Sequence, residues 1–167
     1  MRNPDITKLP PLVLPDGLEL FCHKENRGME KIWEDIIADA FEQRFTFDFL
    51  KNAGDYKPER VLYISKNGIP IATASAVEHQ SYPGEGWFRM VGVKTEARGL
   101  GIGKMIALAA LHSLRDRGYH SALLSTDDHR ISAISLYLSL GFKPFPTHES
   151  HMERWEKVFE TLKGRTK

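Results

Sequence analysis

Three glycines alternate with apolar residues in the run Arg98-Gly99-Leu100-Gly101-Ile102-Gly103-Lys104. Residues 87–93 before it have the pattern of a strand, and residues 102–114 after it have the pattern of a helix. Glycines let a backbone approach an anion closely, and the first N–H groups of a helix point outward, unpaired, at the positive end of the helix dipole. Arg98 and Lys104 add positive charge there. The run predicts a phosphate-binding loop, although a tight turn without a ligand would give the same pattern.

The two common nucleotide-binding motifs do not fit this run. A P-loop requires Ser or Thr directly after its lysine, but Met105 follows Lys104. The dinucleotide fingerprint G-x-G-x-x-G would require a glycine at residue 104. If the loop holds phosphates, they belong to another kind of ligand.

A second motif, Ala133-Ile134-Ser135-Leu136-Tyr137-Leu138-Ser139-Leu140-Gly141-Phe142, lies downstream. The glycine run resembles the R/Q-x-x-G-x-G/A pyrophosphate loop of the GNAT superfamily of N-acetyltransferases. The second motif is similar to the family's A-x-x-x-Y-x-x-x-G-F segment. The motifs stand in the family's order, and the resemblance covers roughly residues 18–145. It implies acetyl-CoA as the co-substrate.

The resemblance also implies which residues contact acetyl-CoA. The pantetheine arm would run like an extra strand where the strands at 87–93 and 122–125 diverge. A bulge in the first of these strands would aim one N–H group at the thioester oxygen and stabilise the oxyanion. The expected cofactor-binding residues are Val91, Gly92, Val93, Arg98, Gly99, Leu100, Gly101, Ile102, Gly103, Lys104 and Arg130.

Tyr137 is the expected catalytic residue, because it matches the family's tyrosine that protonates the departing CoA thiolate. A phenol can do this, since its O–H is a hydrogen-bond donor. Tyr137 lies three residues after Ile134, so a core-facing aromatic is the alternative. No metal site is expected, because residues 148–151 are one residue too short for the zinc motif H-E-x-x-H.

The chain departs from the family pattern at two places. Residues 87–93 contain no acid, whereas many members carry the general base there. Arg130 stands seven residues before the tyrosine, where many members have Asn. It is expected either to contact the cofactor phosphates or to be an ordinary residue at the helix start. The general base would then come from another part of the chain, and each candidate residue has the alternative of being a solvated loop residue without a catalytic role. The candidates are Glu78, His79, Glu85, Asp127 and a chain of water molecules.

These residues require a scaffold that the apolar patterning predicts. We expect an α/β fold of the α+β type: a mixed, mostly antiparallel central sheet with helices on both faces, in which the strands at 87–93 and 122–125 are parallel and splayed. Asn67-Gly68 predicts a hairpin, and Asp127 and Asp128 are expected to cap the following helix. The predicted strands are 18–22, 61–65, 69–77, 87–93 and 122–125, after an irregular start. The predicted helices are 29–41, 45–50, 102–117, 131–140 and 149–162, of which 45–50 also fits a strand.

The composition is that of one globular domain over residues 1–167, with a core at about 18–145. The amphipathic helix at 149–162 should pack on this body or on a partner, such as a second copy in a homodimer. With 23 basic and 22 acidic residues, the net charge of +1 offers no field for nucleic acid. The chain has one cysteine and no apolar run of membrane-spanning length, so a cytoplasmic protein without membrane partners is expected.

The leading functional hypothesis is transfer of acetyl from acetyl-CoA to a primary amine of a small molecule or peptide, by direct attack in a ternary complex. The missing strand carboxylate supports an alternative, a catalytically weak CoA-binding sensor or scaffold. A third hypothesis keeps the fold but uses a longer acyl group or an alcohol acceptor. Four aromatic residues are expected either to shape the acceptor pocket or to belong to the core: Phe45, Phe47, Tyr82 and Trp87.

Overall fold

One six-stranded sheet organises the protein, in a computed structural model that describes residues 1–23, 28–52, 55–78 and 81–165. The strand order is β1-β6-β5-β4-β3-β2, and every neighbouring pair is antiparallel except β5 and β6. The strands are β1 (Arg2–Asn3), β2 (Leu18–Cys22), β3 (Val61–Lys66), β4 (Ile69–Glu78), β5 (Gly86–Val93) and β6 (Ala122–Leu123). The predicted fold class, including the parallel pair, is confirmed.

Five α-helices and two short 3-10 helices complete the fold. The α-helices are α1 (Met29–Phe41), α2 (Phe47–Lys51), α3 (Ile102–Asp116), α4 (Ile131–Ser139) and α5 (Ser150–Arg165). The 3-10 helices are η1 (Pro58–Arg60) and η2 (Thr95–Ala97). The segment at 45–50, whose pattern fits either a helix or a strand, forms the helix α2, in agreement with the prediction. None of the helices in the described ranges is long and apolar enough to cross a membrane.

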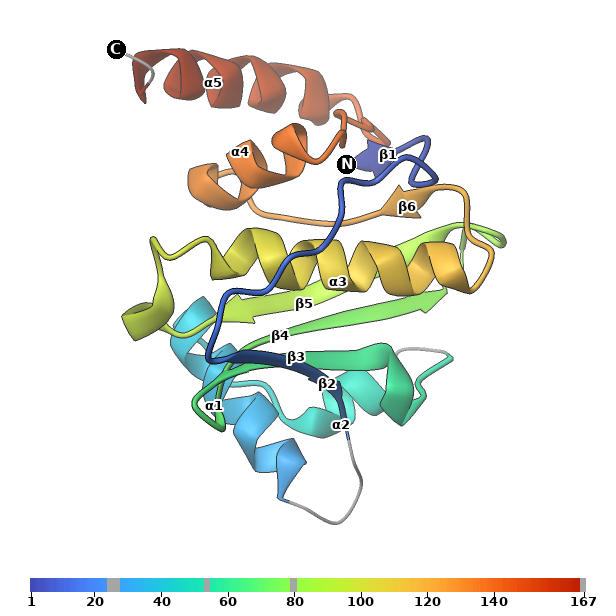
Figure 1. The fold of residues 1–167 in the computed structure, drawn as a ribbon. Helices are drawn as coiled ribbons and strands as arrows, with labels where there is room; N and C mark the ends of the chain where they lie inside the picture. The colour runs from blue at the N-terminus through green and yellow to red at the C-terminus, as the bar shows by residue number, and fades with distance from the viewer. Residues whose placement is uncertain (24–27, 53–54, 79–80, 166–167) are drawn as a thin grey trace.

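The helices form a layer on each face of the sheet (Figure 1). Side chains alternate along a strand, so β3 contributes to two hydrophobic clusters. Leu62 and Ile64 pack with α3, whereas Val61 and Tyr63 pack with α1 and α2. β3 and β4 are accordingly almost continuously buried, and most of their residues are apolar.

The pairing of β5 and β6 covers two residues of each strand, so one edge of β5 is left uncovered beyond it. Gly86 pairs with Ala122 and Trp87 pairs with Leu123, where β6 ends. From Phe88 onward, β5 has no strand on that side among the described residues. The predicted splay between these strands is therefore present, and it leaves backbone groups of β5 free to bind a ligand.

A β-bulge lies in β5 directly beyond this opening. Ser75 pairs with Arg89 and Thr73 pairs with Gly92, so two residues of β5, at 90 and 91, face one residue of β4. Met90 has a φ of 50°, a left-handed conformation that is uncommon for a residue with a side chain. The bulge bends β5 and turns its backbone toward the gap.

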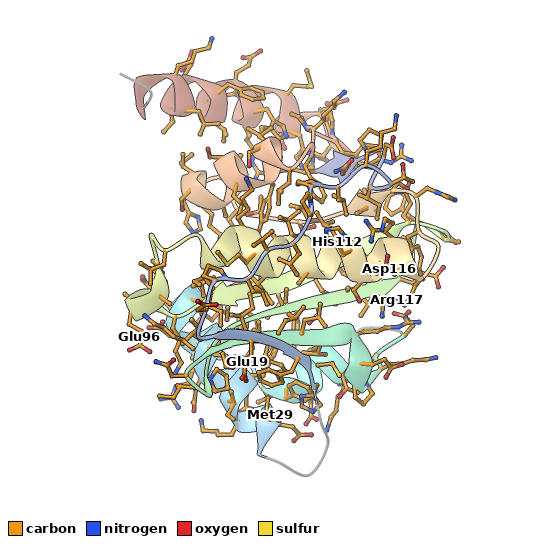
Figure 2. All side chains as sticks on the ribbon, in the orientation of Figure 1. Glu19, Met29, Glu96, His112, Asp116 and Arg117 are labelled. Carbon is orange, nitrogen blue, oxygen red and sulfur yellow. The ribbon has the colours of Figure 1, made fainter. Side chains whose placement is uncertain are left out.

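The N-terminal segment is more ordered than predicted. It was expected to be irregular up to residue 18, but β1 pairs with β6, and Arg2 also bridges to Lys143. Two residues are too few to show the alternation that identifies a strand. Ile6 is buried, with its N–H bonded to the His120 carbonyl. The segment then crosses α3 (Figure 1), where the Pro10 carbonyl lies 2.8 Å from Nε2 of His112, which Figure 2 labels.

The predicted side-chain cap of the helix at 131 is wrong. The residue at the N-cap of α4 is Arg130, and no side chain caps the helix. Asp127 instead accepts a hydrogen bond from Arg130 Nε at 3.0 Å, and Asp128 accepts one from Arg154 Nε of α5 at 2.6 Å. Both carboxylates accept hydrogen bonds from arginine side chains rather than from the N–H groups of the helix.

The C-terminal helix packs on the body of the protein. Val158 of α5 is buried against Ile131 and Ile134 of α4, and Figure 1 shows α5 lying along α4 at the top of the molecule. This agrees with one of the two arrangements that its amphipathic pattern allowed.

Candidate functional site

The glycine-rich loop connects η2 to α3 in a conformation that exposes backbone donors. Gly99 and Gly101 have φ values of 78° and 76°, in the left-handed region that favours glycine, and Gly101 is the N-cap of α3. Among the described residues, no backbone carbonyl accepts from the N–H groups of residues 99–103; the first bond is from Lys104 N to Gly101 O, at 3.0 Å. These free donors at a helix start are what an anion requires.

Asp39 of α1 anchors this loop. Its carboxylate accepts hydrogen bonds from the backbone N–H of Thr95 and, at 3.1 Å, from the Thr95 hydroxyl. Arg98 Nη2 also donates to the Asp39 carbonyl, at 3.4 Å. These contacts fix the entry of α3 relative to α1, although sequence analysis had not singled out Asp39.

A cavity of about 570 Å³ lies beside the loop and runs along β5 and α4. Gly92 and Leu100 lie outside its wall: Gly92 faces α1, where a Cβ would come within 3.1 Å of Ile37 Cδ1, and the Leu100 side chain is exposed. The other predicted residues all line the cavity. They are Val91, Val93, Arg98, Gly99, Gly101, Ile102, Gly103, Lys104, Arg130 and Tyr137.

Two further cavities continue from the first. One of about 200 Å³ shares part of its wall with the large cavity, and we call it the acceptor cavity because it is lined by Phe45 and Trp87, which were expected at the acceptor pocket. The shared residues are Phe41, Val91, Arg130, Ala133 and Tyr137. The other, of about 410 Å³, reaches α5 and adjoins the acceptor cavity. The shared residues there are Trp87, Leu124, Ser125 and Thr126. The three cavities therefore adjoin in series, from the glycine loop to α5.

Tyr137 lies where the large cavity meets the acceptor cavity. Its ring packs edge-on against Phe88, at 5.7 Å between centroids, and lies 6.1 Å from Phe142. Burial raises the pKa of Tyr137 to about 12. No hydrogen bond within the described ranges involves its hydroxyl. At neutral pH the phenol therefore keeps its proton and can donate it in a hydrogen bond to a ligand.

The raised pKa of Tyr137 predicts a loss of stability in alkali. Its ordinary value is 10.0, so between pH 10 and about pH 12 the unfolded chain loses the phenol proton before the folded one does. The folded state is therefore favoured below pH 10 and loses about 2–3 kcal/mol as the pH rises to 12. In urea unfolding across this range, Tyr137→Phe should lose stability less steeply than the wild type. Equal slopes would contradict the burial-induced shift.

Arg130 belongs to the wall of the groove as well as to the helix start. Its guanidinium lies 4.2 Å from the centre of the Phe41 ring, and its Nε is 3.0 Å from Asp127 Oδ2. The residue lines both the large cavity and the acceptor cavity. It is therefore placed to meet a ligand that passes between them.

Of the candidate bases, Asp127 lies in the wall of the acceptor cavity. Glu78 accepts from Gly84 N at 3.2 Å, and Glu85 accepts from the Ser121 hydroxyl at 2.7 Å and pairs with Arg2. Neither glutamate lines any of the three cavities. His79 lies outside the described residues.

The aromatic residues that were expected at the acceptor pocket divide between pocket and core. Phe45 and Trp87 line the acceptor cavity, and Tyr82 and Trp87 line the cavity near α5. Phe47 is 2% exposed, with its ring stacked 4.7 Å from that of His23, and belongs to the core.

The acceptor cavity also contains residues that the sequence analysis missed: Phe41, Phe49 and Arg89. Arg89 could have been found, because it is the one charged residue in the otherwise apolar stretch at 87–93. A charge within a strand that is buried in the sheet indicates a specific role.

Comparison with known proteins gives a consistent result. A model of the acetyltransferase (GNAT) family matches residues 23–142. A mycothiol acetyltransferase from Thermobispora bispora is 31% identical over 154 residues, covering 85% of this chain and 52% of the relative. One from Paenarthrobacter aurescens is 39% identical over 151 residues, covering 83% and 46%. The chain thus spans about half the length of the curated relatives it matches.

Solved structures share the fold. A GCN5-related N-acetyltransferase from Sphaerobacter thermophilus has a TM-score of 0.69 and 24% identity, over 84% of this chain and 46% of that one. A chain of the NatC complex bound to Gag peptide and CoA has a TM-score of 0.68 and 17% identity, over 80% and 92%. At these identities the likeness concerns the architecture alone.

Proposed function

The chain belongs to the acetyltransferase (GNAT) family, and from this premise we propose that it transfers an acetyl group from acetyl-CoA to a primary amine. The observation that carries the proposal is the position of Tyr137, between a cavity that begins at free N–H groups of a helix start and a second, smaller cavity. Two substrates can thus meet at one phenol. The relatives named mycothiol acetyltransferase support an acetyl-transfer reaction.

The large cavity would hold the acetyl-CoA. The pyrophosphate would accept hydrogen bonds from the free N–H groups of residues 99–103, next to the ammonium group of Lys104. The pantetheine arm would lie along β5 at Val91 and Val93, where no described strand pairs with β5 on its β6 side beyond Trp87. Backbone groups of β5 would pair with its amides as a neighbouring strand does.

The acceptor amine would approach from the acceptor cavity and attack the thioester carbonyl carbon. A C–N bond forms, negative charge develops on the carbonyl oxygen, and the C–S bond then breaks as the thiolate departs. An N–H group of the bulge at residues 90–91 is available for the oxyanion, because the bulge removes these residues from regular pairing with β4.

Tyr137 would stabilise the departing thiolate mainly as a hydrogen-bond donor. A thiol has an ordinary pKa of about 8.5, whereas burial raises the pKa of Tyr137 to about 12. Complete transfer of the phenol proton to the thiolate is therefore uphill. The phenol can share its proton while the C–S bond breaks, and solvent then protonates the released CoA.

Asp127 would take the proton that the amine loses, directly or through water, because its carboxylate lies in the wall of the acceptor cavity. We expect Asp127→Asn to lower kcat/KM by ~10²-fold near neutral pH, a typical loss for a general base. A higher pH should restore part of the rate, because more of the amine is then neutral and hydroxide can take the proton that the nitrogen loses after attack. An unchanged pH–rate profile would remove Asp127 from this role.

Steady release of CoA from acetyl-CoA tests the proposed function, with a panel of small-molecule and peptide primary amines. A non-catalytic CoA-binding sensor would bind acetyl-CoA in calorimetry and release no CoA with any amine. The same panel with longer acyl-CoA thioesters, and with alcohols, tests the remaining alternatives. Failure to bind acetyl-CoA would overturn the proposal as a whole.

A further inference from the structure

Arg89 lines the acceptor cavity, and its guanidinium lies over two aromatic rings. Its guanidinium carbon is 4.4 Å from the centre of the Trp87 ring and 5.1 Å from the centre of the Phe49 ring. Trp87 precedes it by two residues on β5, and Phe49 reaches it from α2. The guanidinium is therefore positioned by a strand and by contacts with rings from two different elements.

The Arg89 guanidinium has no anionic partner in the described part of the chain. Its Nε is buried and makes no hydrogen bond, and burial lowers its pKa below the ordinary value. Five other arginines in the described ranges do pair with carboxylates. They are Arg2, Arg60, Arg115, Arg130 and Arg154.

A half-buried cation without a counter-ion is costly, so its retention in a cavity indicates that a ligand supplies the missing charge. The contacts with the two rings restrict the guanidinium, and its fork of donors matches a carboxylate or a phosphate. The acidic residue of this cavity, Asp127, already pairs with Arg130. The acceptor cavity therefore has an excess of positive charge.

We propose that Arg89 binds an anionic group, a carboxylate or a phosphate, carried by the acceptor amine. This inference rests on the proposed function, because it names the class of molecule that enters the acceptor cavity. Arg89 and Tyr137 both line this one cavity, whose volume is about 200 Å³. The anionic group must therefore lie within a few bonds of the amine that attacks beside Tyr137.

The binding test needs no turnover. In the CoA-saturated protein, the Nε–Hε NMR signal of Arg89, assigned by its loss in Arg89→Gln, is followed during addition of acetate or inorganic phosphate. We expect a saturable shift with at least one of the two, which distinguishes the carboxylate source from the phosphate source. Shifts no larger than those caused by chloride at equal ionic strength would overturn the proposal.

The turnover test compares matched amines: alanine with alaninamide, and phosphoethanolamine with ethanolamine. We expect Arg89→Gln to reduce the anionic-to-neutral ratio of kcat/KM at least tenfold, mainly through KM. The control is Arg115→Gln, which removes one positive charge at an exposed pair with Asp116 and should preserve the ratio. An equal ratio in wild type and Arg89→Gln would overturn the proposal. If none of the four amines reacts, the NMR titration decides alone.

The two proposals fail in different ways. If acetyl-CoA does not bind in calorimetry, the proposed function fails. If acetyl-CoA binds and amines react without regard to their anionic groups, only the role of Arg89 fails. Circular dichroism of Arg89→Gln must match the wild type for either comparison to count.

Discussion

Replacement of Gly101 by valine is expected to lower the affinity for acetyl-CoA at least a hundredfold, which corresponds to about 2.8 kcal/mol. Gly101 has a φ of 76°, which a β-branched residue adopts only with strain. Its Cβ would meet only Met105 Cε, at 3.7 Å, so conformation rather than space is the obstacle. The loop would have to change its path, and the free N–H groups at the start of α3 would no longer converge on the pyrophosphate.

Gly118 provides a matched control for this change. It lies after the other end of α3 with a φ of 90°, and a Cβ there would meet nothing within 4 Å. Gly118→Val therefore imposes similar backbone strain far from the groove, and should reduce stability without weakening acetyl-CoA binding. Calorimetry measures the affinities, and circular dichroism shows whether α3 remains helical. Wild-type affinity in a folded Gly101→Val variant would rule out the glycine loop as the pyrophosphate site.

Most of the scaffold could be predicted because it depends on short-range patterns. The hairpin between β3 and β4 follows from Asn67-Gly68, and α3 follows from its apolar spacing after the glycine run. The cavity beside the loop then forms because β6 ends at Leu123 while β5 continues. Local chemistry sets the hairpin and the helix, so both can be read from the order of the residues.

Features that depend on distant contacts could not be predicted in this way. The strand β1 exists because β6 offers it a free edge more than a hundred residues away. Asp127 and Asp128 had the right type and position for a helix cap, but Arg130 and Arg154 compete for their carboxylates. Phe45 and Phe47 are two residues apart, yet one faces the groove and the other the core. Only the tertiary packing decides between them.

The second large effect is expected for Tyr137→Phe, which should lower kcat by ~10²-fold while the affinity for acetyl-CoA changes little. The ring fills the space between Phe88 and Phe142, and phenylalanine preserves that packing. The hydroxyl forms no hydrogen bond among the described residues, so its loss should cost little stability at neutral pH. The rate would fall because the leaving thiolate would no longer receive a hydrogen bond from the phenol.

Tyr63→Phe is the control that separates catalysis from structure. The Tyr63 hydroxyl lies 3.1 Å from His23 Nδ1, in the hydrophobic cluster on the α1 side of the sheet. Its removal should lower the free energy of unfolding and leave kcat unchanged, the reverse of the result for Tyr137→Phe. Rates of CoA release with an amine from the panel and urea unfolding measure the two effects. Full activity of Tyr137→Phe would show that solvent alone stabilises the leaving thiolate, because no other change in that variant affects the groove.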